Sequence, residues 1–127
     1  MQGYHANIED ETLNNSNFRK VLYTAPHSQL VAMSLLPGEE IGMEVHPDND
    51  QFFRFEKGQG KVIINGEETT VEAEWVAIVP AGANHNVINT GTEDLKLYTI
   101  YSPAHHPDGT IHKTKAEAMA AEEAEHH

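Results

Sequence analysis

The sequence predicts a single all-β domain, a small antiparallel β-barrel or sandwich that ends in a short helix. Short runs rich in Val, Ile, Phe and Thr alternate with turn residues through the middle of the chain, and no helical pattern separates them. The dipeptide Asn65-Gly66 stands between two such runs and is a strong β-hairpin signal. The length of 127 residues suits one domain with one core.

Nine strands are expected, because each apolar run is short and is followed by Gly, Pro, Asn or Asp at a break. In chain order they cover residues 19–24, 30–36, 40–46, 51–56, 60–64, 68–72, 74–79, 86–89 and 95–102. Because the breaks are too short to hold crossover helices, the strands are expected to pair in antiparallel fashion.

The two ends of the chain differ in composition from the middle. We expect residues 1–17 to form a polar surface arm, residues 18–104 the β-barrel, and residues 105–127 a tail with a short helix. Thr114 and Glu117 have the spacing of a capping box in front of an alanine-rich run. Met119 is the one sizeable apolar side chain of that run, so the helix is expected to pack weakly.

Composition argues against several functional classes. The 20 acidic residues outnumber the 8 lysines and arginines, and the net charge of −12 disfavours nucleic acid and anionic membrane as partners. No apolar run is long enough for a transmembrane helix, and the N-terminus lacks the pattern of a secretory signal. The absence of cysteine rules out disulfides and thiolate ligands. We therefore expect a cytoplasmic protein.

Metal-capable side chains gather in two segments beside turns. Glu44 and His46 are two residues apart in a predicted strand, so they point to the same face. Gln51 follows the next turn, and it would lie close to His46 if residues 40–46 and 51–56 form a hairpin. His85 begins another strand after a Pro-Ala-Gly turn. Three strands are thus expected to converge on one ion.

The spacing of these residues resembles the two sequence motifs of the cupin family. The pattern G-x5-H-x-H-x4-E-x6-G is occupied here by Gly38, Glu44, His46, Gln51 and Gly58. The pattern P-x-G-x2-H-x3-N is occupied by Pro80, Gly82, His85 and Asn89. The resemblance covers about residues 30 to 102, and it implies a jelly-roll-like double-stranded β-helix. The first motif departs from the family pattern, because Glu44 replaces its first histidine and Gln51 replaces its glutamate.

In cupins the matching positions bind one divalent transition metal, which implies Glu44, His46, Gln51 and His85 as ligands here. Two imidazoles and one carboxylate suit Fe, Mn, Co, Ni or Zn. The amide of Gln51 would be a weak ligand that leaves room for a substrate. An alternative register uses Asp48 as the carboxylate, but it disturbs the distances to the motif glycines.

The resemblance implies a small cupin that acts on a small polar substrate bound to its metal, as an isomerase, a dioxygenase or a lyase. The alternative is a cupin without catalysis, or without metal, that binds or senses a sugar-like molecule. Arg54 is expected on the face opposite Gln51, and Lys57 and Lys61 are expected near turns. The interior therefore shows no predicted cation, which argues against a strongly anionic substrate.

Several other side chains have open roles. Phe52 is predicted on the outer face, and an exposed aromatic there favours a homodimer. Tyr98 and Tyr101 lie on opposite faces of one strand, so only one of them faces the interior. The tail histidines are predicted in a polar surface turn, and the alternative is a flap that brings an imidazole to the site. They are His105, His106 and His112. His126 and His127 are compatible with a remnant of a purification tag, and we leave them out.

Overall fold

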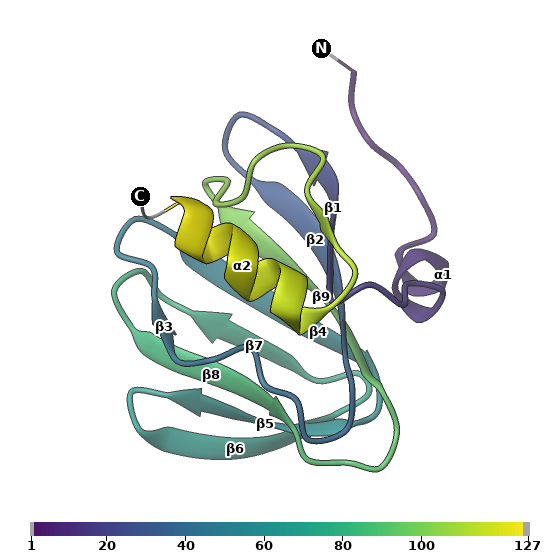
Figure 1. Ribbon diagram of the computed structural model, residues 1–127, viewed down its shortest axis with the longest axis vertical. Helices are drawn as coiled ribbons and strands as arrows, with labels where there is room; N and C mark the ends of the chain where they lie inside the picture. Colours follow the sequence, from purple (N-terminus) through teal and green to yellow (C-terminus); the bar gives the residue numbers. More distant parts are fainter. Residues whose placement is uncertain (1, 126–127) are drawn as a thin grey trace.

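The computed structural model describes residues 2–125, which form two antiparallel sheets, two helices and their connections (Figure 1). The six-stranded sheet has the order β10-β1-β2-β9-β4-β7, and the four-stranded sheet has the order β3-β8-β5-β6. The strands are β1 (Arg19–Thr24), β2 (Gln29–Leu35), β3 (Glu44–Val45), β4 (Asp50–Lys57), β5 (Gln59–Ile64), β6 (Glu67–Glu72), β7 (Val76–Val79), β8 (Asn84–Asn89), β9 (Leu95–Ser102) and β10 (Ile111–His112). The all-β prediction is confirmed.

The hydrophobic core lies between the two sheets. Alternate residues of each strand point inward, as the pleat requires, so Phe53 and Phe55 of β4 are fully buried while Phe52 and Arg54 are only partly buried. Each fully buried large apolar side chain contributes about 1.5–3 kcal/mol. Those with no exposed surface are Val31, Met33, Leu35, Phe53, Phe55, Val87, Leu95 and Leu97.

The inner face changes from apolar to polar along β4 and β9. Phe55 lies opposite Leu97, Phe53 opposite Thr99, and Gln51 opposite Tyr101. All six of these side chains are buried. Buried polar groups need partners or a function, because burial without a hydrogen bond is unfavourable. The polar end of the barrel is therefore where a functional site is to be sought.

The prediction of a strand over residues 40–46 is wrong for most of its length. Only Glu44–Val45 forms a strand there, preceded by a single bridge from Glu40 to Ile88. Gly42 has a φ of +107°, and its N–H donates to Asn86 Oδ1 at 2.9 Å instead of joining the ladder. The left-handed backbone and the side-chain acceptor together interrupt the strand.

The hairpin expected between 40–46 and 51–56 is also wrong. β3 pairs with β8, whereas β4 pairs with β7 and β9 in the other sheet. The turn between β3 and β4 therefore carries the chain from one sheet to the other. A turn of this length can either close a hairpin or cross between sheets, so the local sequence did not distinguish these two connections.

The Asn65-Gly66 hairpin is confirmed. β5 and β6 pair with Ile64 opposite Glu67, and Asn65 and Gly66 have φ values of +50° and +83°. Positive φ at both central positions is typical of the type I′ turn, whose twist matches that of the paired strands.

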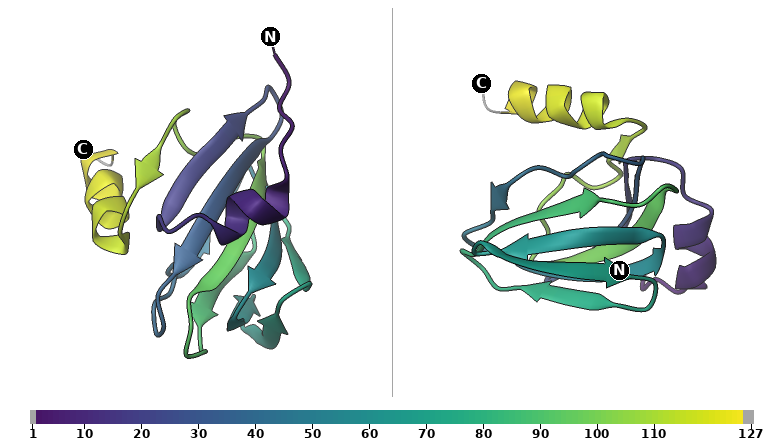
Figure 2. Two further views of the ribbon diagram at one scale, coloured as in Figure 1. Left: turned by 90° about the vertical axis from the view of Figure 1, so that its right-hand side faces the viewer. Right: turned by 90° about the horizontal axis from the view of Figure 1, so that it is seen from below.

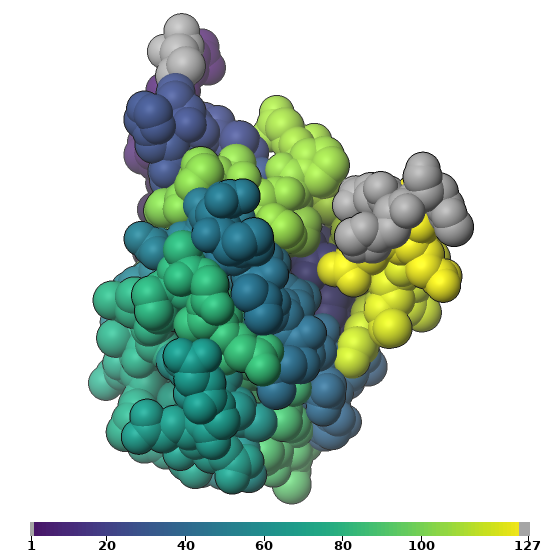
Figure 3. Space-filling model, turned by 90° about the vertical axis from the view of Figure 1, so that its left-hand side faces the viewer, coloured from purple at the N-terminus to yellow at the C-terminus, as the bar shows by residue number. Residues whose placement is uncertain are grey.

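The C-terminal helix is confirmed as α2 (Lys115–Glu125). Thr114 Oγ1 accepts a hydrogen bond from Glu117 N at 3.1 Å, as the capping box predicts. Ala118 joins the core, whereas Met119 is 58% exposed. Figure 2 shows α2 outside the two sheets, and Figure 3 shows it beside the blue segment that leads to β3. Among residues 2–125, no helix is long and apolar enough to cross a membrane.

Two elements of the terminal segments were not predicted. Helix α1 (Ile8–Leu13) is capped by Asn7, whose Oδ1 accepts from Asp10 N at 3.1 Å, and it packs against β9, β4 and β2. The short strand β10 pairs with β1 and places Ile111 and His112 in the six-stranded sheet. His126 and His127 lie outside the described residues.

The edge strand β7 carries exposed apolar side chains. Ile78 is 64% exposed, and Val76 and Trp75 are about half exposed. Phe52 lies opposite Ile78 on the neighbouring strand. This edge is where a second copy of the chain would bury apolar surface, so it fits the homodimer expected from Phe52, which stays a prediction.

We predict that Ile78→Asp shifts the protein from dimer to monomer in light scattering coupled to size exclusion, because a carboxylate would be buried at the contact. Met119→Asp, which changes a similarly exposed apolar residue on α2, should leave the mass unchanged. A wild-type monomer at all concentrations would rule out the dimer.

A comparison of Gly58→Ala with Gly66→Ala by urea denaturation measures the steric cost of a Cβ atom at position 58. Both glycines have positive φ, which costs alanine about 1–2 kcal/mol. Only at position 58 would the new Cβ also meet a backbone atom, the Asp94 carbonyl oxygen at 2.8 Å. We predict that Gly58→Ala lowers the free energy of unfolding by about 1 kcal/mol or more beyond the loss in Gly66→Ala. Equal losses would show that the Asp94 backbone moves freely.

Candidate metal centre

Pairing of β3 with β8 brings the two motif segments together. Glu44 lies directly opposite His85 in this antiparallel pair, and His46 is the first residue after β3. The carbonyl of His46 accepts a hydrogen bond from Gly82 N at 2.9 Å, which joins the ends of both segments. Glu44 and His46 therefore share a face, as predicted, while Val45 is exposed on the other side.

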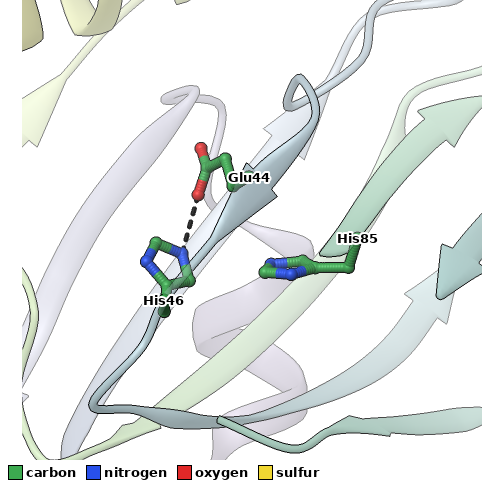
Figure 4. A group of neighbouring side chains, drawn as sticks. All are labelled: Glu44, His46 and His85. Atoms are coloured by element: carbon green, nitrogen blue, oxygen red, sulfur yellow. Dashed lines mark ion pairs between the residues drawn. The ribbon is translucent and has the colours of Figure 1, made fainter. Parts of the chain in front are cut away.

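Three side chains converge in this region (Figure 4). His46 Nε2 is 2.7 Å from Glu44 Oε2, and the ring centroids of His46 and His85 are 5.3 Å apart. One potential ligand atom from each of Glu44, His46 and His85 lies within 4.8 Å of the other two. Both imidazoles are buried, and Glu44 is half-buried.

His85 is held in the form that binds metal. Its Nδ1 lies 3.1 Å from the Ala83 carbonyl oxygen, which can only accept, so Nδ1 carries the proton and Nε2 keeps its lone pair. Burial lowers the pKa of His85 below its ordinary value, and the charge of His46 acts in the same direction. A neutral imidazole with a fixed tautomer is what a metal ligand requires.

Glu44 is held in its ionised form. Burial alone would raise the pKa of its carboxyl group, but the hydrogen bond from His46, together with the charges of His46 and Arg19, outweighs burial and lowers it. The cluster thus combines one carboxylate with two imidazoles. This donor set and its spacing fit a divalent transition metal.

Gln51 lies on the inner face of β4, as predicted, and is 3% exposed. Its Nε2 donates to Thr99 Oγ1 at 3.0 Å, while its Oε1 is buried with no hydrogen-bond partner among the described residues. An amide oxygen left without a partner fits a weak fourth ligand. That role for Gln51 stays a prediction.

Two tail histidines lie against the cluster. The ring of His105 is 4.2 Å from that of His46 and stacks on Tyr101 at 5.4 Å between centroids. His106 Nε2 is 3.2 Å from the Tyr101 hydroxyl, and burial, followed by the charge of Arg19, lowers the pKa of His106 to about 2. The contact is therefore a hydrogen bond between a neutral imidazole and the Tyr101 hydroxyl. Tyr101, rather than Tyr98, faces the interior.

A buried glutamine holds these histidines in place. Gln29 Oε1 accepts from the backbone N–H groups of His105 and His106 at 3.1 and 3.0 Å, and its Nε2 donates to the His106 carbonyl at 2.7 Å. Gln29 has no exposed surface. Gln29 was not predicted as a site residue, because His105 and His106 are 76 and 77 residues away along the chain.

Arg19 was also missed. It is 2% exposed at the start of β1, where Arg19 and Val21 alternate inward. The expectation that the interior carries no cation is therefore wrong. The alternation of Arg19 and Val21 in the sequence was the one signal for it, since residues two apart in a strand share a face.

The family model for a cupin domain matches residues 31–101, more than half of the chain. The chain belongs to the cupin family. The match includes all four predicted ligands, the four-stranded sheet and most of the six-stranded sheet, and it confirms the resemblance seen in the two motifs. The first motif of this cupin keeps the carboxylate but has it at Glu44.

Two relatives resemble this cupin over most of its length. An uncharacterized protein of Bacillus subtilis, YrkC, is 48% identical over 123 residues, which are 92% of this chain and 66% of the relative. The crystal structure of BH2720 from Bacillus halodurans has a TM-score of 0.92 and 46% identity, and the match covers 94% of this chain and 95% of that one. Neither name states an activity.

A more distant relative has a named ligand. The oxalate-binding protein of Thermotoga maritima is 28% identical over 68 residues, which are 54% of this cupin and 56% of the relative.

We predict that Glu44→Ala weakens binding of Co²⁺ by more than 100-fold in isothermal titration. Loss of a supporting residue alone typically costs about 10–100-fold in metal affinity, and a ligand should cost more. Asp48→Ala is the matched control, because Asp48 is exposed and lies outside the three-residue cluster. Loss of binding in Asp48→Ala with retention in Glu44→Ala would favour the alternative register.

Proposed function

We propose that this cupin binds one divalent transition metal through Glu44, His46 and His85, with Gln51 as a weak fourth ligand, and acts as an enzyme on a small polar substrate. The observation that carries the proposal is the convergence of one carboxylate and two imidazoles within 4.8 Å at the polar end of the barrel. Fe, Mn, Co, Ni and Zn all suit these donors.

The residues present would leave coordination positions open. Three firm ligands and one amide oxygen do not fill an octahedral shell, and structural metal sites are usually closed whereas catalytic sites are open. When bound, the metal would supply Lewis-acid or oxygen-activating chemistry. Glu44 contributes the negative charge, and the hydrogen bond from His85 to Ala83 fixes the direction of one imidazole.

His105 is the candidate for proton transfer. Its ring contacts that of His46, and Gln29 holds its backbone, so it has a defined position at the cluster. An imidazole has an ordinary pKa near neutrality and can both accept and donate a proton. His106 is suited instead to orient Tyr101, because burial keeps it neutral.

The test is whether a bound metal accepts an outside ligand. We expect untagged protein to take up one equivalent of Co²⁺, and we expect imidazole, a neutral ligand, to change its visible spectrum. A Co²⁺ spectrum that imidazole leaves unchanged would indicate a closed structural site. Less than a tenth of an equivalent of any transition metal, with no uptake on titration, would overturn the metal proposal.

Measurement of substrate turnover distinguishes an enzyme from a protein that only binds its ligand. We predict that His105→Gln lowers kcat on a substrate found by screening small polar compounds by about 100-fold or more, with the metal content unchanged, because proton transfer by a positioned side chain typically contributes 10²–10⁴-fold. Glu67→Gln, an exposed change outside the cluster, is the control. A compound that binds and is recovered unchanged from wild-type protein would favour the binding or sensing alternative.

A further inference from the structure

Arg19 is a buried cation that the proposed function does not use. Its side chain lies on the inner face of β1, and the residue is 2% exposed. Nη1 lies 3.3 Å from His112 Nδ1, a neutral contact when the ring accepts. The Arg19 Cζ lies 5.4 Å from the centre of the Phe18 ring. Among residues 2–125, its buried Nε has no hydrogen-bond partner, and no carboxylate forms an ion pair with the guanidinium.

An unpaired buried guanidinium is unfavourable, because it has lost its hydration without gaining an opposite charge. The other arginine of the chain shows the contrast. Arg54, on the outer face of β4, has its Nε 3.0 Å from Glu56 Oε1. The fold thus pairs its outer arginine and leaves Nε of its inner one available.

Arg19 also acts electrostatically on the candidate metal cluster. Its charge contributes to the lowered pKa of Glu44 and to that of His106, so it lies within electrostatic range of both groups. β10 brings His112 opposite Arg19 in the sheet, and the same tail brings His105 onto His46. The tail therefore contacts both the cation and the imidazoles of the cluster.

We propose that Arg19 forms an anion subsite next to the metal ligands, and that the natural ligand of this cupin is a small carboxylate held by the guanidinium while a neighbouring oxygen meets the metal. The inference rests on the proposed metal centre and names its substrate class. A guanidinium edge with a free Nε–H matches a carboxylate in geometry and charge, whereas a lysine would supply only a point charge.

The experiment uses Co²⁺-loaded protein and two probes of similar shape, glycolate and its neutral amide, glycolamide. Binding is followed by the visible spectrum of the metal. We expect Arg19→Gln to weaken glycolate binding about tenfold or more, since a charge-assisted hydrogen bond of this kind is lost. Glycolamide binding should change by less than threefold, and Arg54→Gln should leave both affinities as in wild type.

Three results would overturn the subsite. The first is a glycolate affinity that is unchanged in Arg19→Gln. The second is a loss of glycolamide affinity equal to that of glycolate, because such a loss would indicate that Arg19 has a structural role. A fall in the thermal stability of the metal-free variant would also indicate a structural role, whereas removal of an unpaired buried charge should leave stability equal or higher.

A titration of metal-free protein distinguishes failure of the metal proposal from failure of the anion subsite. If the wild-type protein takes up no metal, glycolate is titrated calorimetrically into the metal-free protein and into Arg19→Gln. Binding that depends on Arg19 would support the anion subsite without the metal, and no binding to wild-type protein would overturn it.

Discussion

The pairing of β3 with β8 is the contact on which the candidate site depends. It sets Glu44 opposite His85, and the adjoining hydrogen bond from Gly82 to the His46 carbonyl joins the ends of both segments. Only two residues of β3 are in regular strand geometry. A short strand at a sheet edge has few hydrogen bonds of its own, so the side chains around it must contribute to holding it in place. An ion between Glu44, His46 and His85 would link β3 to β8 and stabilise the same contact.

The interior combines two kinds of packing. Along β4 and β9, a stack of fully buried apolar side chains gives way to Gln51 and Tyr101. The apolar part supplies most of the folding free energy, since hydrophobic burial is the dominant favourable term. The polar part carries groups that are costly to bury, among them the Gln51 Oε1 and the Arg19 Nε, neither of which has a hydrogen-bond partner among the described residues. Such unsatisfied groups are expected at functional sites and not in a core selected for stability alone.

Much of the fold was predictable from local pattern. The bounds of β1 and β9 agree with prediction, and the Asn65-Gly66 turn and the Thr114 cap are where the sequence places them. These features depend on residues close together in the chain. The break in the predicted strand at 40–46 was not predictable, because Asn86 supplies the acceptor for Gly42 from 44 residues away. Helix α1 is six residues long, too short for its periodicity to be recognised.

By itself, the sequence determined the strand pattern, the cupin motifs and the identity of Glu44, His46 and His85 as metal-capable residues, because alternation and spacing are local properties. Only the tertiary structure decided which strands pair, that Glu44 faces His85, and that Gln29 brings His105 to the cluster. It also showed that Arg19 is buried with no carboxylate partner among the described residues. Those outcomes depend on contacts between residues far apart in the chain, and they follow from the packing of the two sheets and the tail as a whole.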